Sequence, residues 1–409
     1  MKFTTRLLHD TFAPDAATGA TTQPIYQSSA FYQPTAEDME RVFAGKKPGF
    51  VYTRVGNPTI AGFERRVNAL EGGVGAVACA SGMAAVSQAV LNILSQGAEI
   101  LASGGLYGGT SSLFRDFAQY GITVRYAAGD RVEDFAEELS ERTRLIYVET
   151  IGNPKLDVVD IAALAELAEL AHAHGVPLFV DNTVTTPYLC QPLSLGADVV
   201  IHSTSKALNG NGNSIGGIVV SGGVFRYDAA RYPKMKEYQF GPMSFLVRMR
   251  MRMVTDYGGC MAPFNAYLTG IGLDTLALRL DRICENALAL ARLCEAKGFD
   301  VNYPGLETSP YHEVAQRQFG GRYGAMMTLR LGTKERAYQF INHLHYALNV
   351  SNIGDARTLV LHPASTIFVH SSAEEKENGG VTDDLVRINV GIEDTDDLIE
   401  DFTGALAAL

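Results

Sequence analysis

The chain has 409 residues, of which 46% are hydrophobic and 19% charged, a composition typical of a folded globular protein of about two domains. Its formal charge of −11 is spread without long acidic or basic blocks, which argues against nucleic acid or an anionic membrane as a partner. The five cysteines are an odd number and are never spaced C-x-x-C, so we expect a cytoplasmic protein with free thiols.

The first segment, residues 1–57, lacks sustained apolar periodicity and carries several prolines, which predicts an extended arm with at most short helices and no core of its own. Within it Tyr52 and Arg54 lie two positions apart in a segment that looks extended, so their side chains are predicted to point the same way. A phenol beside a guanidinium suits a phosphate group. An edge strand with a solvated arginine is the alternative interpretation.

From residue 58 to about 254, helical stretches alternate with short apolar runs. This alternation predicts an α/β fold, a mainly parallel sheet wrapped by helices. Sheets of this kind bind ligands at the carboxyl ends of their strands. The predicted strands cover residues 75–79, 99–102, 122–126, 145–148, 177–180, 199–201 and 217–220.

Small and polar residues follow several of these strands. Gly82 and Met83 open a helix after the first strand, and their amides favour an anion such as a phosphate, although a helix cap without a ligand explains the pattern equally well. Tyr107, followed by two glycines, can lie against a flat molecule. Asn153 is predicted to extend its amide into the same cleft.

Two charged residues end the next pair of strands. Asp181 directly follows four apolar residues, where an unpaired carboxylate would be costly and a protonated pyridine nitrogen would pair it. The strand at 199–201 leads through Ser203 and Ser205, two donors for a phosphate, to Lys206. Without these hydroxyl neighbours, Lys206 would be interpreted as an ordinary surface lysine. An amine in a partly desolvated site, however, loses its proton more easily and can form a Schiff base. The set predicts a site for pyridoxal 5′-phosphate (PLP).

Residues 255–409 contain longer helices and fewer strands, which predicts a smaller α+β domain. Arg387 lies inside a predicted strand, and its partner is either an amino-acid carboxylate or a structural ion pair with Glu393 or Asp394. The predicted helices cover 273–294 and 334–348, and the clearest strands cover 325–331 and 385–393.

Two patterns are read as structural. Arg248, Arg250 and Arg252 alternate with methionines, which predicts a helix or a subunit surface rather than a nucleic-acid patch. His172 and His174 lie in a helical pattern without a cysteine or carboxylate at metal-ligand spacing, so no metal site is predicted.

The chain resembles the PLP-dependent transsulfuration enzymes of cysteine and methionine metabolism over nearly its whole length. The resemblance implies the aspartate-aminotransferase-like fold (fold type I). It also implies that Tyr52 and Arg54 reach the phosphate of the neighbouring subunit, so that a dimer is the minimal active unit; most relatives are tetramers. The motifs that carry it are Tyr52-Thr53-Arg54 with Asn57-Pro58-Thr59, Ser81-Gly82-Met83, Leu106-Tyr107-Gly108, Glu149-Thr150 with Asn153-Pro154, Val180-Asp181-Asn182-Thr183, His202-Ser203 with Lys206, and Arg387 with Val390-Gly391-Ile392-Glu393.

Within this family the chain is most similar to the O-acetylhomoserine sulfhydrylases. That similarity implies a transferase of methionine biosynthesis that converts O-acetyl-L-homoserine and sulfide to homocysteine and acetate. Lys206 would hold PLP and move protons, Asp181 would protonate the ring nitrogen, and Tyr107 would stack on the ring. The substrate carboxylate would be bound by Arg387, Asn153 and the Asn352 region. The motifs are Asn352-Ile353-Gly354-Asp355-Ala356, Leu361-His362-Pro363-Ala364-Ser365-Thr366, Gly380-Val381-Thr382 and Ser214-Ile215-Gly216-Gly217.

Other activities of the family use the same catalytic residues: methionine or cystathionine γ-lyase, cystathionine γ-synthase and O-succinylhomoserine sulfhydrylase. Gly109, where methionine γ-lyases usually carry cysteine, and Asn352, where γ-lyases commonly carry serine, favour the sulfhydrylase. Asn211 and the pair Ile367-Phe368 depart from the usual histidine and Thr-His pair. A non-catalytic binding protein with the same fold is the remote alternative.

Overall fold

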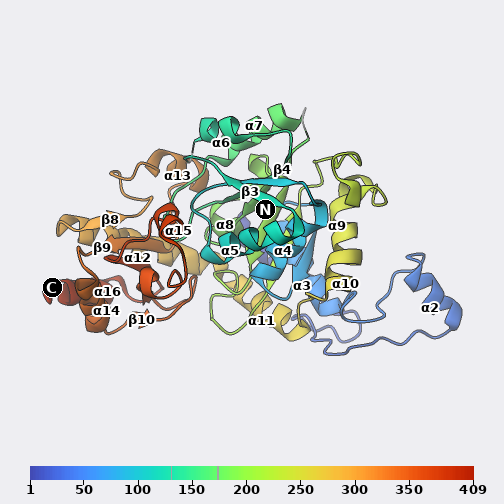
Figure 1. Ribbon diagram of the computed structural model, residues 1–409. Coiled ribbons are helices and arrows are strands. Elements are labelled where there is room, and N and C mark those ends of the chain that lie inside the picture. Colours follow the sequence, from blue (N-terminus) through green and yellow to red (C-terminus); the bar gives the residue numbers. More distant parts are fainter. Residues whose placement is uncertain (130, 173–174) are drawn as a thin grey trace.

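Two β-sheets and the helices around them make up the computed structural model, which describes residues 1–129, 131–172 and 175–409 (Figure 1). His174, one of the two histidines predicted to lie on a helix surface, falls outside these residues. Within the described residues, no helix has the length and apolar character needed to cross a membrane. The five cysteines are free thiols, and four of them are buried.

The larger sheet has seven strands in the order β1-β7-β6-β5-β4-β2-β3. All neighbours are parallel except β7, which is antiparallel to both β1 and β6, so the predicted mainly parallel α/β sheet is confirmed. Its central strands are apolar and buried on both faces, as in sheets covered by helices on two sides. The strands are β1 (Gly75–Cys79), β2 (Glu99–Ala102), β3 (Thr123–Tyr126), β4 (Thr143–Glu149), β5 (Leu178–Asp181), β6 (Val199–Ser203) and β7 (Gly217–Ser221).

Local sequence signals define the helices that begin at the sheet. Helix α3 (Pro58–Glu71) starts with Asn57 as N-cap and Pro58 in the first turn, and it ends at Gly72, whose φ of 77° suits glycine. Helix α4 (Gly82–Ile93) is capped by the Ser81 hydroxyl, which accepts a hydrogen bond from the Ala84 amide. Such a cap stabilises a helix by about 1 kcal/mol. The other helices of this part are α5 (Gly108–Asp116), η1 (Phe117–Tyr120), α6 (Val132–Glu138), α7 (Ile161–His172), α8 (Thr186–Leu189), η2 (Pro192–Leu195), η3 (Pro233–Met235), η4 (Gly241–Met243), α9 (Ser244–Arg248), η5 (Met249–Val254), α10 (Thr255–Tyr257) and α11 (Pro263–Asp274).

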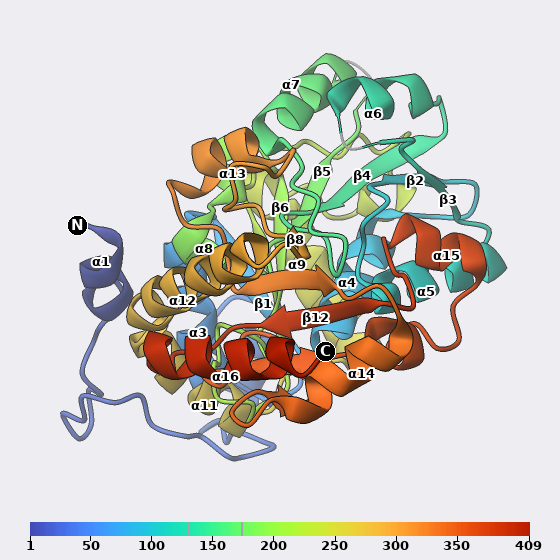
Figure 2. The same ribbon diagram turned by 90° about the vertical axis from the view of Figure 1, so that its left-hand side faces the viewer.

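The smaller sheet has five strands in the order β10-β11-β12-β9-β8 and is mostly antiparallel. Figure 2 shows α12 and α16 lying side by side next to it. One apolar core contains residues of both sheets, such as Val148 and Val386, so the two parts share a rigid junction. The elements are α12 (Leu276–Ala296), β8 (Asp300–Asn302), α13 (His312–Phe319), β9 (Met326–Arg330), α14 (Lys334–His343), β10 (Leu348–Asn349), β11 (Leu359–Leu361), η6 (Pro363–Ser365), α15 (Ala373–Asn378), β12 (Leu385–Asn389) and α16 (Thr395–Ala407).

Two predicted helices differ from the observed ones. The predicted helix 334–348 is shorter, because α14 ends at His343 and Leu348 begins β10. The predicted helix 273–294 is divided, because α11 ends at Asp274 and α12 starts at Leu276. The guanidinium of Arg279 donates to the Gly272 carbonyl at 2.7 Å and thereby satisfies the end of α11. The helix predicted for the alternating arginines is confirmed; Arg252 is exposed, whereas Arg248 is buried and donates to the Asn92 carbonyl at 2.7 Å.

The N-terminal arm contains α1 (Phe3–His9), which packs against α3, and α2 (Ala36–Phe43), which extends away from the body at the right of Figure 1. Helix α2 has no buried residue, consistent with an arm that lacks its own core. The segment predicted to be extended is instead a turn, because the Val55 amide donates to the Tyr52 carbonyl at 2.9 Å. Arg54 still lies beside Tyr52, with its guanidinium carbon 5.4 Å from the ring centre. The domain bounds 1–57, 58–254 and 255–409 stay predictions.

Candidate active site

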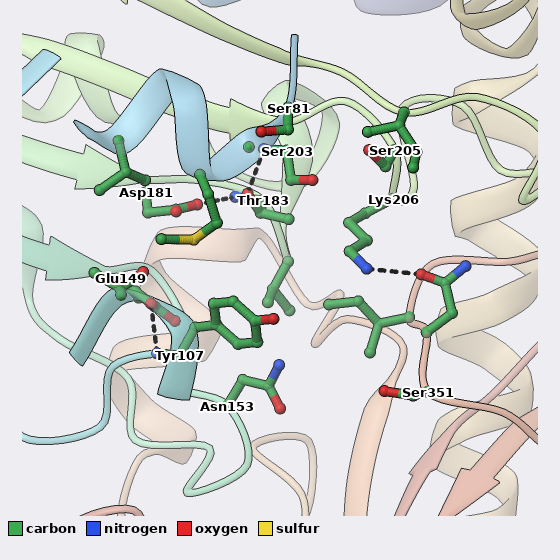
Figure 3. Close-up of a pocket in the computed structure, with 18 of the residues that line it drawn as sticks. Ser81, Tyr107, Glu149, Asn153, Asp181, Thr183, Ser203, Ser205, Lys206 and Ser351 are labelled. Atoms are coloured by element: carbon green, nitrogen blue, oxygen red, sulfur yellow. Dashed lines mark hydrogen bonds between the residues drawn. The ribbon is translucent and has the colours of Figure 1, made fainter. Parts of the chain in front are cut away.

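A cavity of about 420 Å³ opens at the carboxyl ends of β4, β5 and β6, between the two sheets (Figure 3). Its volume lies within the range of small-molecule and cofactor sites. Ten of the twelve residues predicted for the site line this cavity: Gly82, Met83, Tyr107, Asn153, Asp181, Ser203, Ser205, Lys206, Asn352 and Arg387.

Lys206 extends its side chain into this cavity from the turn that follows β6. Its Nζ donates to Asn352 Oδ1 at 2.7 Å. Burial, and then the positive charge of Arg387, lower the pKa of Lys206 to about 8. A lowered pKa raises the fraction of neutral amine near neutral pH, and the neutral amine is the nucleophile that attacks a carbonyl.

Asp181 ends β5 beside another buried carboxyl, that of Glu149, which is its register partner on β4. The Thr183 amide donates to Asp181 Oδ1 at 3.0 Å, and the Tyr147 hydroxyl lies 3.4 Å from Oδ2. Burial raises the pKa of Asp181, while the hydrogen bonds from Thr183 oppose that rise. Burial and the charge of Asp181 raise the pKa of Glu149 well above its usual range. A cationic ring nitrogen at Asp181 would relieve this accumulation of negative charge.

The N-terminus of α4 forms an anion cradle. Within the part of the chain that the structure describes, the amides of Gly82 and Met83 have no hydrogen-bond acceptor, since Ser81 is engaged by the amides of Ala84 and Ala85. A Cβ on Gly82 would come within 2.6 Å of Ser203 Cβ, so only glycine leaves this space open. Free amides at a helix N-terminus attract phosphate.

The two serines predicted as phosphate donors differ in their surroundings. The hydroxyl of Ser205 donates to the Gly216 carbonyl at 3.2 Å and accepts from the Gly216 amide at 3.0 Å. Ser203 presents its side chain beside Gly82, on the cradle side. The side chain of Ser203 thus lies beside the anion cradle, whereas the Ser205 hydroxyl is engaged by Gly216, and the residues present fit PLP.

Tyr107 enters the cavity opposite Lys206 (Figure 3). Its amide donates to Glu149 Oε1 at 2.7 Å, which holds the start of α5 against the end of β4. A Cβ at Gly109 would approach Tyr107 Cε1 to 2.5 Å, so a side chain at residue 109 would require the ring to shift. The ring is thus oriented by a buried carboxylate and by the lack of a side chain two residues later.

Arg387 reaches the cavity from β12 of the smaller sheet. Its Nη1 donates to Asn153 Oδ1 at 3.0 Å and its Nη2 to the Asn352 carbonyl at 3.1 Å. Burial lowers the pKa of Arg387 to about 10. Both bonds are to neutral oxygens, and a buried cation without a counter-ion needs an anionic ligand.

The alternative of a structural ion pair is wrong, at least among the residues that the structure describes. The carboxylate of Glu393 accepts instead from the amide and hydroxyl of Thr358, at 2.6 and 2.8 Å. Asp394 lies near Arg282, 4.0 Å away, rather than near Arg387.

Thr183 is a cavity residue that the sequence reasoning did not select. Its amide binds Asp181, and its hydroxyl accepts from the Ser203 amide at 2.8 Å, so it ties the ends of β5 and β6 together. The available signal was a hydroxyl two residues after a strand-final aspartate, a spacing typical of an Asx turn. Ile367 also lines the cavity, whereas Asn211 does not.

Tyr52 and Arg54 are the two predicted residues that do not line the cavity. Arg54 donates through Nη1 to the Thr255 carbonyl, and its guanidinium faces the Tyr52 ring. That Tyr52 and Arg54 reach the phosphate of a neighbouring subunit stays a prediction.

Known proteins resemble this chain over its whole length. The family model of the Cys/Met metabolism PLP-dependent enzymes matches residues 4–407. The chain is 38% identical to a homocysteine synthase of Schizosaccharomyces pombe, over 99% of this chain and 98% of that protein. It is 39% identical to an O-acetyl-L-homoserine sulfhydrylase of Corynebacterium glutamicum, over 100% and 97%.

Solved structures agree with the fold. A putative O-acetylhomoserine (thiol)-lyase of Campylobacter jejuni, whose crystal structure contains a pyridoxyl-lysine monophosphate, superimposes with a TM-score of 0.93 at 29% identity, covering 100% of both chains. A cystathionine γ-lyase of Lactobacillus plantarum superimposes with a TM-score of 0.87 at 31% identity, covering 100% of this chain and 99% of that one. The predicted fold type I is confirmed.

Proposed function

This chain belongs to the Cys/Met metabolism PLP-dependent enzymes, and on that premise we propose that it converts O-acetyl-L-homoserine and sulfide to L-homocysteine and acetate. The observation that carries the proposal is one cavity in which the Lys206 amine and the Arg387 guanidinium both meet Asn352. An amine for a cofactor beside a buried cation for a carboxylate suits an amino-acid substrate.

The cofactor is PLP, and the residues that would hold it are those of the cavity. Lys206 would hold it covalently, Asp181 would bind the ring nitrogen, and the Gly82 and Met83 amides would bind the phosphate. When bound, PLP supplies an electron-withdrawing ring that acidifies the substrate Cα and Cβ protons and so allows a group on Cγ to leave.

The side chains of the cavity then divide the remaining tasks. Arg387, oriented by Asn153 Oδ1 and the Asn352 carbonyl, binds the substrate carboxylate and fixes the position of Cα. Lys206, with a pKa of about 8, takes protons from Cα and Cβ and returns them, because a base works best when its pKa is close to the working pH. Tyr107 lies against the ring and supplies a phenol for a further proton transfer.

We also propose that the working unit is a homodimer or a larger homo-oligomer. Tyr52 and Arg54, on the N-terminal arm, do not line the cavity of their own chain, and Arg54 donates to the Thr255 carbonyl instead. In a two-fold dimer such an arm can complete the phosphate site of the partner.

The test is an assay of the purified protein with O-acetylhomoserine, O-succinylhomoserine, cystathionine and methionine, with and without sulfide. Homocysteine formation from O-acetylhomoserine and sulfide should exceed breakdown of methionine or cystathionine by at least about two orders of magnitude in kcat/KM. That ratio corresponds to roughly 2.7 kcal/mol of differential transition-state binding. Comparable rates would instead identify a γ-lyase.

A further inference from the structure

A second cavity, of about 850 Å³, adjoins the first, and the two share Tyr107 and Ile367 as walls. It lies between α5 and the segment 366–372 that leads into α15. The two helices lie near each other in Figure 2. A group that extends from the reaction centre beyond Tyr107 and Ile367 therefore points toward this second cavity.

Charge on the walls of the second cavity is confined to one pair. Among the described residues that line it, the only arginine, lysine, aspartate or glutamate side chains are Arg115 and Glu375. Arg115 Nη1 forms an ion pair with Glu375 Oε1, and its Nη2 lies 3.5 Å from the Ser112 hydroxyl. The remaining lining is apolar or carries uncharged groups, apart from His370. The one cation of the wall is thus already neutralised.

The Glu375 carboxylate is held in place independently of Arg115. It occupies the third position of α15 in a capping box, in which its Oε2 accepts from the Ser372 amide at 2.8 Å. In return the Ser372 hydroxyl accepts from the Glu375 amide at 3.1 Å. A carboxylate fixed by a helix start stays where it neutralises Arg115.

We propose that the Arg115–Glu375 pair selects the acyl group of the substrate: it admits an uncharged ester such as acetyl and rejects an ester whose chain ends in a carboxylate, such as succinyl. This inference rests on the proposed function and names its substrate class. Size does not make the distinction, because the cavity is as large as sites that hold drug-sized ligands.

Electrostatics makes the distinction instead. The Arg115 side chain is 61% exposed, so a second carboxylate near it stays partly hydrated and meets the repulsion of Glu375 together with the attraction of Arg115. The pair thus discriminates against the wrong substrate by placing a like charge beside Arg115, the one lysine or arginine among the described residues that line this cavity.

The experiment compares kcat/KM for O-succinylhomoserine and O-acetylhomoserine, each with sulfide, in the wild type and in Glu375→Gln. Glutamine can also occupy the third position of a capping box, so this variant keeps the helix start and removes only the charge. The succinyl-to-acetyl ratio should rise at least about tenfold, because Arg115 is freed for the substrate carboxylate. Glu377→Gln, an exposed glutamate of the same helix, is the matched control and should leave the ratio within about twofold.

A double variant identifies the receiving cation. Arg115→Gln combined with Glu375→Gln should return the ratio to the wild-type value, because no cation then remains. This inference alone is contradicted if the succinyl-to-acetyl ratio is unchanged in Glu375→Gln protein that is folded, yellow and active on the acetyl ester. It is also contradicted if the increase in that ratio persists in the double variant. A wild type that prefers the succinyl ester also contradicts it. Absence of homocysteine from both esters contradicts the proposed function itself.

Discussion

The sheet edge and the N-terminal arm contribute to the predicted site in different ways. Asp181 and Lys206 follow adjacent parallel strands, and the register of those strands places them at one edge of the sheet, inside one cavity. Tyr52 and Arg54 lie on a segment without a core, outside that cavity. Adjacent parallel strands end at the same edge of the sheet, so residues at their carboxyl ends lie close together. The arm, by contrast, would reach a site only through contact with another chain.

The largest effect is expected at the sheet edge, from Lys206→Ala. Loss of the amine should remove covalent PLP and lower kcat by about four orders of magnitude, because both the attachment and the proton transfers are lost. Borohydride treatment followed by peptide mapping should find pyridoxyl-lysine in the wild type and none in the variant. Lys297→Ala, an exposed lysine just after α12, should behave as the wild type. Retained pyridoxyl-lysine in Lys206→Ala would mean that another lysine holds the cofactor.

The arm is tested next, by Arg54→Ala. This variant should lose about two to three orders of magnitude in kcat/KM, because a charge-assisted contact with the phosphate is removed. Equimolar mixing with Lys206→Ala chains under subunit exchange should restore about a quarter of wild-type activity, since half of the dimers are hybrids and each has one intact site. Arg41→Ala, which changes an exposed arginine of the same arm, is the control. This variant should be active by itself, before any mixing with Lys206→Ala chains, because it keeps both Lys206 and Arg54. If the mixture of Arg54→Ala and Lys206→Ala chains stays inactive although subunits exchange, the arm does not contribute to the site of the neighbouring subunit.

A smaller effect is expected at the cradle, from Gly82→Ala. The new Cβ would come within 2.6 Å of Ser203 Cβ and must displace it, which narrows the phosphate site. The dissociation constant of PLP from the apoenzyme should rise by about one to two orders of magnitude. Gly404→Ala in α16, where an added Cβ meets no atom within 4 Å, is the control and should leave it unchanged. Unchanged affinity in Gly82→Ala would place the phosphate elsewhere.

The smallest effect concerns the pH dependence of cofactor attachment. Burial disfavours the charged amine, so the rate at which apoenzyme takes up PLP should rise with pH around a midpoint near 8, where Lys206 loses its proton. Arg387→Gln removes a like charge and should move this midpoint upward, yet not to the ordinary lysine value of 10.5, because burial is the larger cause. Arg330→Gln, at the end of β9, should leave the midpoint in place. A downward shift in Arg387→Gln would contradict this account of the lysine.

Much of the fold was predictable because local signals carried it. All seven strands of the larger sheet overlap the predicted runs, and β4 and β5 are mostly apolar because both of their faces are buried, whereas the edge strand β3 is largely exposed. The turn at Tyr52 was missed because the alternation of side chains there resembles a strand, whereas in the described part of the chain Tyr52 forms only an isolated bridge with Ala30. The division at Thr275 was missed because the hydrophobic pattern continues across it.

The sequence by itself determined which groups stand at the strand ends: an amine, a carboxylate, a phenol and a helix start with a glycine. Only the tertiary structure decided that Lys206 meets Asn352, 146 residues away, and that Arg387 meets Asn153, 234 residues away. It also decided the lowered pKa of Lys206 and the neutralisation of Arg115 by Glu375, 260 residues away. These properties depend on burial and on charges from distant segments, and no local pattern of residues records either of them.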